Sequence, residues 1–255
     1  MLIGDVVGRP GRRVVNEWVP RLIRDRGLDF VVANGENAAG GNGLTHEVAD
    51  ALWASGIDVL TSGNHIFDKR EVLEFLDDSS QVIRPLNYPH GVPGRGVTVM
   101  PARSGSLVAV LNVSGQSFMP AAYGNPFEAV DAALAELPPV DAIFVDMHAE
   151  TTSEKAAMGW YLDGRVAAVV GTHTHVQTAD ERILPGGTAF LTDLGMTGPY
   201  NSVIGVRTPL VLEKLTRQMP VRFETASGPA QLCGLIITVE GGRSLDVERV
   251  FLREP

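Results

Sequence analysis

The sequence contains a single cysteine, Cys233, among its 255 residues. A disulfide within the chain and a zinc cluster made of several cysteines are therefore excluded. Long apolar runs are also absent, because stretches such as RVAAVVG and CGLIITV are far shorter than the roughly 20 residues that a membrane-spanning helix needs. The N-terminus lacks the basic region and long apolar segment of a signal peptide. We therefore expect a cytoplasmic protein with no membrane partner.

Positive charge is scarce, since 21 Lys and Arg face 30 Asp and Glu and the formal net charge is −9 at pH 7. Duplex nucleic acid would be repelled on average, because binding it relies on cations that neutralise its phosphates. The glycine-rich segments GRPGR and GENAAGGNG lack the Gly-Lys-Ser/Thr ending of a P-loop, and no G-x-G-x-x-G occurs. ATP hydrolysis and dinucleotide binding are thus disfavoured. A small phosphate ester stays possible, because metal ions in a pocket would dominate the local field.

The hydrophobic content of 44% and charged content of 20% are those of a globular protein. No internal repeat or linker-like segment divides the chain, so we expect one domain over residues 1–255, which could form a homo-oligomer. Apolar periodicity predicts helices over residues 16–27, 45–56 and 68–78. Short β-branched runs predict strands at 30–33, 57–60, 107–113, 141–145, 166–170 and 188–192, with a C-terminal hairpin over 233–252. This alternation predicts an α/β fold with one sheet or a pair of sheets and helices outside.

Polar side chains follow directly after most of the expected strands. The carboxyl ends of neighbouring parallel strands share one edge of a sheet, which is where ligands bind in open α/β folds. We therefore expect these side chains to gather at that edge: Asp5, Glu36, Asn37, Asn64, His65, His148, His173, His175 and Asp193. The segment SFMPAAYGNPF, residues 117–127, has the length and composition of a mobile flap over the same edge.

Seven of these residues have the chemistry of metal ligands. Imidazole nitrogen with carboxylate and amide oxygen, without sulfur, suits Mn²⁺, Fe or Zn²⁺. Seven donors are too many for one ion and about right for two, as in two-metal hydrolases, and Glu36 is placed to bridge the pair. Such a site would keep a net positive charge and attract phosphate. The predicted ligands are Asp5, Glu36, Asn37, Asn64, His148, His173 and His175.

Each residue alone also has an ordinary structural interpretation. Asp5 resembles a turn residue, His148 a core histidine, and Asp193 a residue that holds a loop or a ligand histidine. Amidohydrolase barrels also use a His-x-His pair, but there the pair follows the first strand, whereas here it follows a late one. A third possibility is a non-catalytic regulatory protein that holds metals and binds a phosphate ligand or a protein partner.

Five segments together resemble one known family. They are GDVVGRPGR, NGENAAGGNGLT, SGNHIFDK, DMHAETTSEK and GTHTHVQTADERILPGGTAFLTDLGMTGP. In this order they are similar to the YmdB-type branch of the calcineurin-like metallophosphoesterases, and the similarity extends along nearly the whole chain. The resemblance implies a four-layer α/β/β/α sandwich. It also implies a dinuclear phosphodiesterase that acts on small phosphodiesters, most of all 2′,3′-cyclic nucleotides such as 2′,3′-cyclic AMP.

The resemblance further implies a role for each site residue. One metal would be held by Asp5, Glu36, Asn37 and His175, and the other by Glu36, Asn64, His148 and His173. A hydroxide bridging two ions, with Fe or Mn expected and Zn possible, would attack phosphorus in line, while His65 would protonate the leaving oxygen. One departure is that the wider superfamily has Asp-x-His at its first strand, whereas this chain has DVV, so that Asn37 would supply the missing donor.

Overall fold

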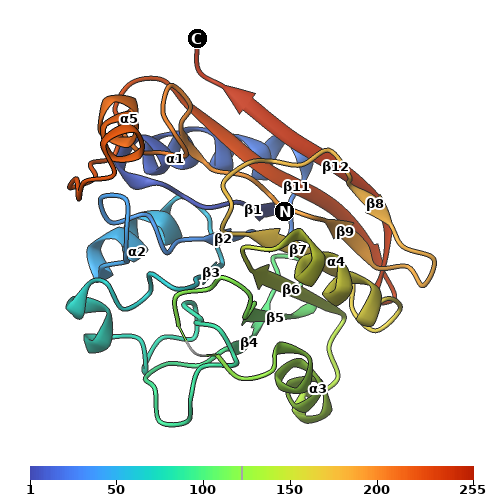
Figure 1. The fold of residues 1–255 in the computed structure, drawn as a ribbon. Helices are drawn as coiled ribbons and strands as arrows, with labels where there is room; N and C mark the ends of the chain where they lie inside the picture. Colours follow the sequence, from blue (N-terminus) through green and yellow to red (C-terminus); the bar gives the residue numbers. More distant parts are fainter. Residues whose placement is uncertain (122) are drawn as a thin grey trace.

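The computed structural model describes residues 1–121 and 123–255 and places helices outside two six-stranded sheets (Figure 1). Residue 122, within the segment expected to form a flap, lies outside the described residues. The first sheet has the order β10 (Gly198–Pro199), β11 (Ala230–Glu240), β1 (Leu2–Ile3), β2 (Val32–Asn34) and β3 (Val59–Thr61), with β12 (Arg243–Arg253) paired to β11. The second has the order β4 (Val97–Pro101), β5 (Leu107–Ser114), β6 (Ala142–His148), β7 (Ala168–Thr172), β9 (Ala189–Leu191) and β8 (Arg182–Ile183).

Strands β1 to β3 run parallel, as do β5, β6, β7 and β9, so each sheet collects several strand ends at one edge. The helices are α1 (Gly8–Arg26), α2 (His46–Ala54), α3 (Pro126–Glu136), α4 (Thr152–Tyr161) and α5 (Thr208–Arg217), with a short 3₁₀ helix η1 (Arg70–Glu74). Two helix ends agree with the sequence-based expectation. Thr45 caps α2 by accepting from the Val48 backbone N–H, and Gly27 ends α1 in a left-handed conformation.

Three hydrophobic cores separate four layers. Alternation along the strands divides their side chains between the cores, so that Leu2 faces the second sheet while Ile3 faces the helices. The outer cores lie between α1 and α2 and the first sheet, and between α3 and α4 and the second sheet. The middle core joins the two sheets through residues such as Val59, Val110 and Val170. The expected α/β/β/α sandwich is thus confirmed, and two open sheets exclude the barrel alternative.

Two helix predictions were wrong in extent. Residues 68–78 form only η1 and turns, because the Asp77 carboxylate accepts from the Gly94 backbone N–H and the Asp77 carbonyl from Arg95. Those contacts hold the end of the segment away from an α-helical path. Helix α1 begins at Gly8 rather than near residue 16. A side chain at Gly11 would meet the Thr197 carbonyl oxygen at 2.3 Å, so glycine there serves close packing of α1 rather than a loop.

The other sequence-based element predictions are confirmed within a few residues, including the C-terminal hairpin of β11 and β12. Helices α3, α4 and α5 and strand β4 were not expected from periodicity. Among the described residues, no helix is both long and apolar enough to cross a membrane.

Candidate metal centre

The predicted ligands meet where the strand ends of the two sheets face each other. Asp5, Glu36 and Asn64 follow β1, β2 and β3 of the first sheet, while His148 ends β6 and His173 follows β7 of the second. The hydrogen-bond contacts described below connect them across the boundary between the sheets. A cavity of about 510 Å³ opens beside them, and its walls include Glu36, His65, His173 and His175.

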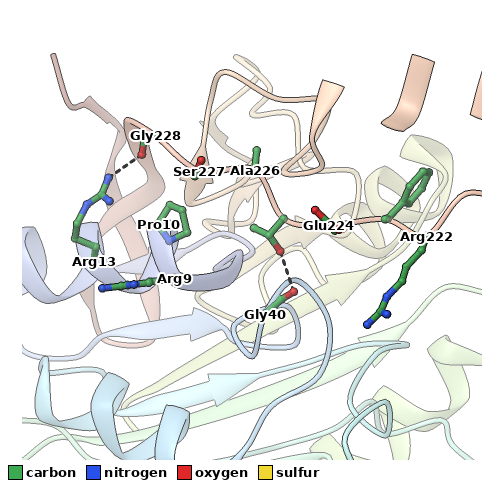
Figure 2. A pocket seen from close by; sticks show the side chains of 11 residues that line it. Arg9, Pro10, Arg13, Gly40, Arg222, Glu224, Ala226, Ser227 and Gly228 are labelled. Atoms are coloured by element: carbon green, nitrogen blue, oxygen red, sulfur yellow. Dashed lines mark hydrogen bonds between the residues drawn. The ribbon is translucent and has the colours of Figure 1, made fainter. Parts of the chain in front are cut away.

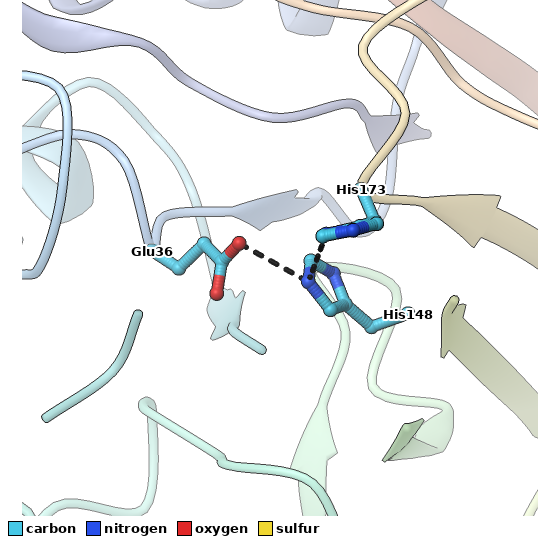
Figure 3. A group of neighbouring side chains, drawn as sticks. All are labelled: Glu36, His148 and His173. Atoms are coloured by element: carbon cyan, nitrogen blue, oxygen red, sulfur yellow. Dashed lines mark hydrogen bonds and ion pairs between the residues drawn. The ribbon is translucent and has the colours of Figure 1, made fainter. Parts of the chain in front are cut away.

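Glu36, His148 and His173 form the tightest group (Figure 3). Each offers one ligand atom, and these three atoms lie within 4.8 Å of one another. The His148 Nε2 atom is 3.1 Å from Glu36 Oε1, 3.1 Å from His173 Nδ1 and 3.0 Å from Asn64 Oδ1. Glu36 and His148 are fully buried, so these polar atoms have little access to water.

This spacing fits a metal ion better than a hydrogen-bond network. The Nε2 atom of His148 can carry at most one proton, yet it faces two oxygen acceptors, Glu36 Oε1 and Asn64 Oδ1, as well as the His173 ring. Ligands on one cation lie roughly 3 Å apart, because each metal–ligand bond is about 2.0–2.2 Å long. The four side chains are therefore placed as the ligands of one cation would be, and their role as metal ligands stays a prediction: Glu36, Asn64, His148 and His173.

A second group of predicted ligands, Asp5, Asn37 and His175, also reaches Glu36. The Asp5 Oδ1 atom is buried and has no hydrogen-bond partner among the described residues, and His175 Nε2 lies 3.6 Å from it. The Asn37 amide nitrogen is 3.3 Å from His175 Nε2 and 3.4 Å from Glu36 Oε1. Burial alone would lower the pKa of His175, but the Asp5 carboxylate raises it to about 9. The buried Asp5 carboxylate thus stabilises positive charge beside it. A bound cation would also supply such a charge.

The His-x-His turn after β7 has a strained backbone. His173 has φ 94° and His175 has φ 65°, conformations that cost a non-glycine residue about 1–3 kcal/mol unless the surroundings impose them. The His173 backbone N–H donates to Asp5 Oδ2. Thr174, between the two histidines, donates to Asp193 Oδ2 through its backbone N–H and its hydroxyl. Asp193 therefore holds the loop, which was its sequence-based interpretation.

Lys155 is a functional candidate that sequence reasoning missed. Its side chain, on α4, is fully buried, and Nζ lies 2.6 Å from Asp193 Oδ2 and 3.3 Å from Thr174 Oγ1. A buried lysine is rare unless it is paired. The ion pair thus fixes the carboxylate that in turn fixes the His-x-His turn. Its only sequence signal was a lysine inside the segment DMHAETTSEK.

We expect Lys155→Met to weaken both folding and metal binding. Removing one partner of a buried ion pair leaves the Asp193 charge uncompensated and costs about 3–5 kcal/mol of unfolding free energy. Metal affinity, measured by titration below the melting temperature, should fall about 10–100-fold because the ligand histidines lose their support. Arg165→Met is the matched control, since it breaks an exposed pair with Asp131 at the same 2.6 Å and should cost about 0–1 kcal/mol. Unchanged metal affinity in Lys155→Met would contradict the positioning role.

His65 lies at the cavity wall beside the predicted ligands. Its backbone N–H donates to Glu36 Oε2 at 2.9 Å, and its side-chain Nδ1 lies 2.8 Å from Asp68 Oδ2. Because Asp68 occupies Nδ1, the Nε2 atom is the ring nitrogen left for a ligand in the cavity. Sequence reasoning missed Asp68, although its spacing of three residues after His65 was a usable signal.

Asp146 is linked to His148 through the hydroxyl group of Thr172. The His148 Nδ1 atom is 2.9 Å from Thr172 Oγ1, whose hydroxyl donates to Asp146 Oδ1 at 2.7 Å. Burial raises the pKa of Asp146 to about 6. Asp146 and His148 are two residues apart on β6, so they share one face, which is the signal that could have identified this partner.

Known proteins resemble this chain along nearly its whole length. Residues 1–250 match the family model described as YmdB-like protein. The chain is 46% identical over 257 residues to a Bacillus subtilis protein named 2′,3′-cyclic-nucleotide 2′-phosphodiesterase, covering 100% of this chain and 97% of that protein. A crystal structure of a Thermus thermophilus protein described only as hypothetical has a TM-score of 0.94 and 43% identity, covering 100% and 98% of the two chains. That of a novel phosphatase from Mycoplasma pneumoniae has a TM-score of 0.92 and 32% identity, covering 99% and 92%.

Proposed function

The chain belongs to the YmdB-like protein family, and from this membership and its site geometry we propose that it is a metal-dependent phosphodiesterase of 2′,3′-cyclic nucleotides. The observation that carries the proposal is the convergence of Glu36, Asn64 and His173 on one nitrogen of His148. The relative that is 46% identical bears the name of this activity, which supports the substrate class.

We propose that the site would hold two metal ions, with Glu36 as a ligand of both. Asp5, Glu36, Asn37 and His175 would hold one ion, and Glu36, Asn64, His148 and His173 the other. The donor set of imidazole, carboxylate and amide contains no thiolate, which favours Fe or Mn, with Zn as an alternative. Bound there, the ions would lower the pKa of an attacking water and neutralise charge on the phosphoryl oxygens.

The chain's own residues complete the reaction. Water loses one proton to solvent and forms a bond to phosphorus, the bond from phosphorus to the ribose 2′ oxygen breaks, and a nucleoside 3′-monophosphate results. His65 donates a proton from Nε2 to the departing 2′ oxygen, with Asp68 fixing the ring through Nδ1. The backbone N–H of His65 meanwhile keeps Glu36 in place. His65 would thus position the metal ligand Glu36 through its backbone and donate the proton through its side chain.

The proposal is tested by metal analysis together with a panel of small phosphodiesters. We expect about two ions per chain after loading with Mn²⁺ or Fe²⁺, and turnover of 2′,3′-cyclic AMP to the 3′-monophosphate, which chelator treatment abolishes and re-added metal restores. A phosphomonoester and an amide substrate serve as controls and should react far more slowly. Stoichiometric ligand binding without turnover in the loaded protein would instead support a regulatory protein.

A further inference from the structure

A second hollow, whose lining includes Arg9, Arg13 and Arg222, shares part of its lining with the cavity of the metal centre. Figure 2 shows this hollow with its side chains. Its volume is about 740 Å³, and we call it the arginine pocket. Arg9 and Arg13 come from the first turns of α1, and Arg222 from the loop that follows α5. Segments far apart in the sequence therefore bring positive charge to one place on a chain whose net charge is −9.

The arginine pocket and the metal-centre cavity share a wall. Gly40, Phe223, Glu224 and Thr225 line both. The Thr225 hydroxyl donates to the Gly40 carbonyl oxygen at 2.8 Å, which joins the loop after β2 to the loop after α5. A ligand in the metal-centre cavity that extended past this contact would therefore enter the arginine pocket.

The three arginines of the arginine pocket differ in whether a carboxylate already pairs with them. The Arg13 guanidinium already binds Glu254 and the Gly228 carbonyl, and Glu224 is paired with Arg207 outside the pocket. Arg9 and Arg222 are exposed and have no ion pair with any carboxylate among the described residues. Each of these two guanidinium groups is thus free of a carboxylate partner and available to an anion. Guanidinium binds phosphate through parallel N–H donors, which makes phosphate the anion that suits them best.

Phe223 adds an aromatic surface between the two hollows. It lines both, its side chain is 42% exposed, and Lys214 Nζ lies 4.7 Å from its ring centre. Exposed aromatic rings beside arginines form the general pattern for binding single-stranded nucleic acid, in which a base stacks on the ring and cations contact the backbone. A cyclic mononucleotide alone would leave this second hollow unused.

We propose that the arginine pocket binds the phosphate on the 5′ side of the terminal nucleotide in RNA strands that end in a 2′,3′-cyclic phosphate. This inference rests on the proposed function and extends its substrate class from mononucleotides to strand ends. When RNA is cleaved by attack of its own 2′-hydroxyl group on the adjacent phosphate, one product strand ends in a 2′,3′-cyclic phosphate. The class of reaction that supplies the substrate is therefore RNA cleavage by internal transesterification.

The test compares 2′,3′-cyclic AMP with the dinucleotide ApA that ends in a 2′,3′-cyclic phosphate, both with the metal-loaded protein. We expect kcat/KM for the dinucleotide to be roughly tenfold higher at low salt. The advantage should fall with KCl, with a log–log slope about 0.7 steeper per phosphate contact. A dinucleotide with an uncharged methylphosphonate link is the matched substrate control, and it should lose most of the advantage.

The test variant carries both Arg9→Ala and Arg222→Ala. The matched control is Arg24→Ala, at the far end of α1. The double variant should bring the dinucleotide-to-mononucleotide ratio close to one, whereas Arg24→Ala should keep it. Binding of the product, ApA with a 3′-phosphate, to metal-free protein should weaken in the same double variant. Equal rates for both substrates in the wild-type protein, or an unchanged ratio in the double variant, would overturn the inference. Failure to hydrolyse either substrate would instead refute the proposed function.

Discussion

Replacing Glu36 with glutamine is expected to remove at least one metal equivalent per chain and to lower turnover of 2′,3′-cyclic AMP about 10³-fold. A loss of this size corresponds to about 4 kcal/mol, within the several kcal/mol that metal-ion stabilisation supplies. Glutamine keeps the volume of Glu36 and can still accept from the His65 backbone N–H. It removes the buried negative charge that both predicted metal sites share.

Metal analysis and steady-state kinetics on the same preparation check this prediction. Glu213→Gln is the matched control, because Glu213 is an exposed glutamate on α5 that is paired with Arg217 and lines neither the metal-centre cavity nor the arginine pocket. This variant should retain its metals and hydrolyse 2′,3′-cyclic AMP at close to the wild-type rate. If Glu36→Gln kept two ions and near-normal turnover, the bridging assignment would be wrong.

His65→Ala is expected to give the opposite pattern, with metals retained and turnover lost. General acid catalysis contributes about 10²–10⁴-fold, so kcat for 2′,3′-cyclic AMP should fall by that factor. Metal content should stay unchanged, because the group that holds Glu36 is the backbone N–H of residue 65, which alanine also has. Metal content and kcat measured together distinguish a proton donor from a ligand.

The leaving group supplies a sharper test of the same role. A phosphodiester with a nitrophenol leaving group needs little protonation, because the phenolate is already a stable anion. His65→Ala should therefore react with this ester at a rate close to that of the wild-type protein while remaining defective on the cyclic nucleotide. Equal losses on both substrates would assign His65 a structural role.

The strand ends were predictable because two local rules coincide there. β-branched runs identify the strands, and polar residues directly after them identify the shared edge, so Glu36, Asn64 and His148 could be placed together without coordinates. The structure brings the predicted side chains together as expected. Their metal roles and the acid role of His65 stay predictions.

What the sequence could not show depends on contacts between distant segments. Lys155 looks like any helical lysine until α4 packs on β7 and buries it beside Asp193. The 3₁₀ helix at residues 70–74 replaces a predicted α-helix because Asp77 contacts residues 94 and 95. Likewise, Arg9 and Arg222 are separated by more than 200 residues, and only the fold puts them in one hollow. Periodicity reports local burial and is blind to such pairings.

The middle core has a further consequence, because the two sheets that it joins each carry part of one ligand set. The separation between Glu36 and His148 depends on how closely residues such as Val59 and Val110 allow the sheets to approach. Protein interiors are packed tightly enough that a single methylene is felt by its neighbours. Substitutions in this core can thus change the rate of the reaction although they contact no reacting group. Activity as well as folding therefore limits which residues the core accepts in evolution.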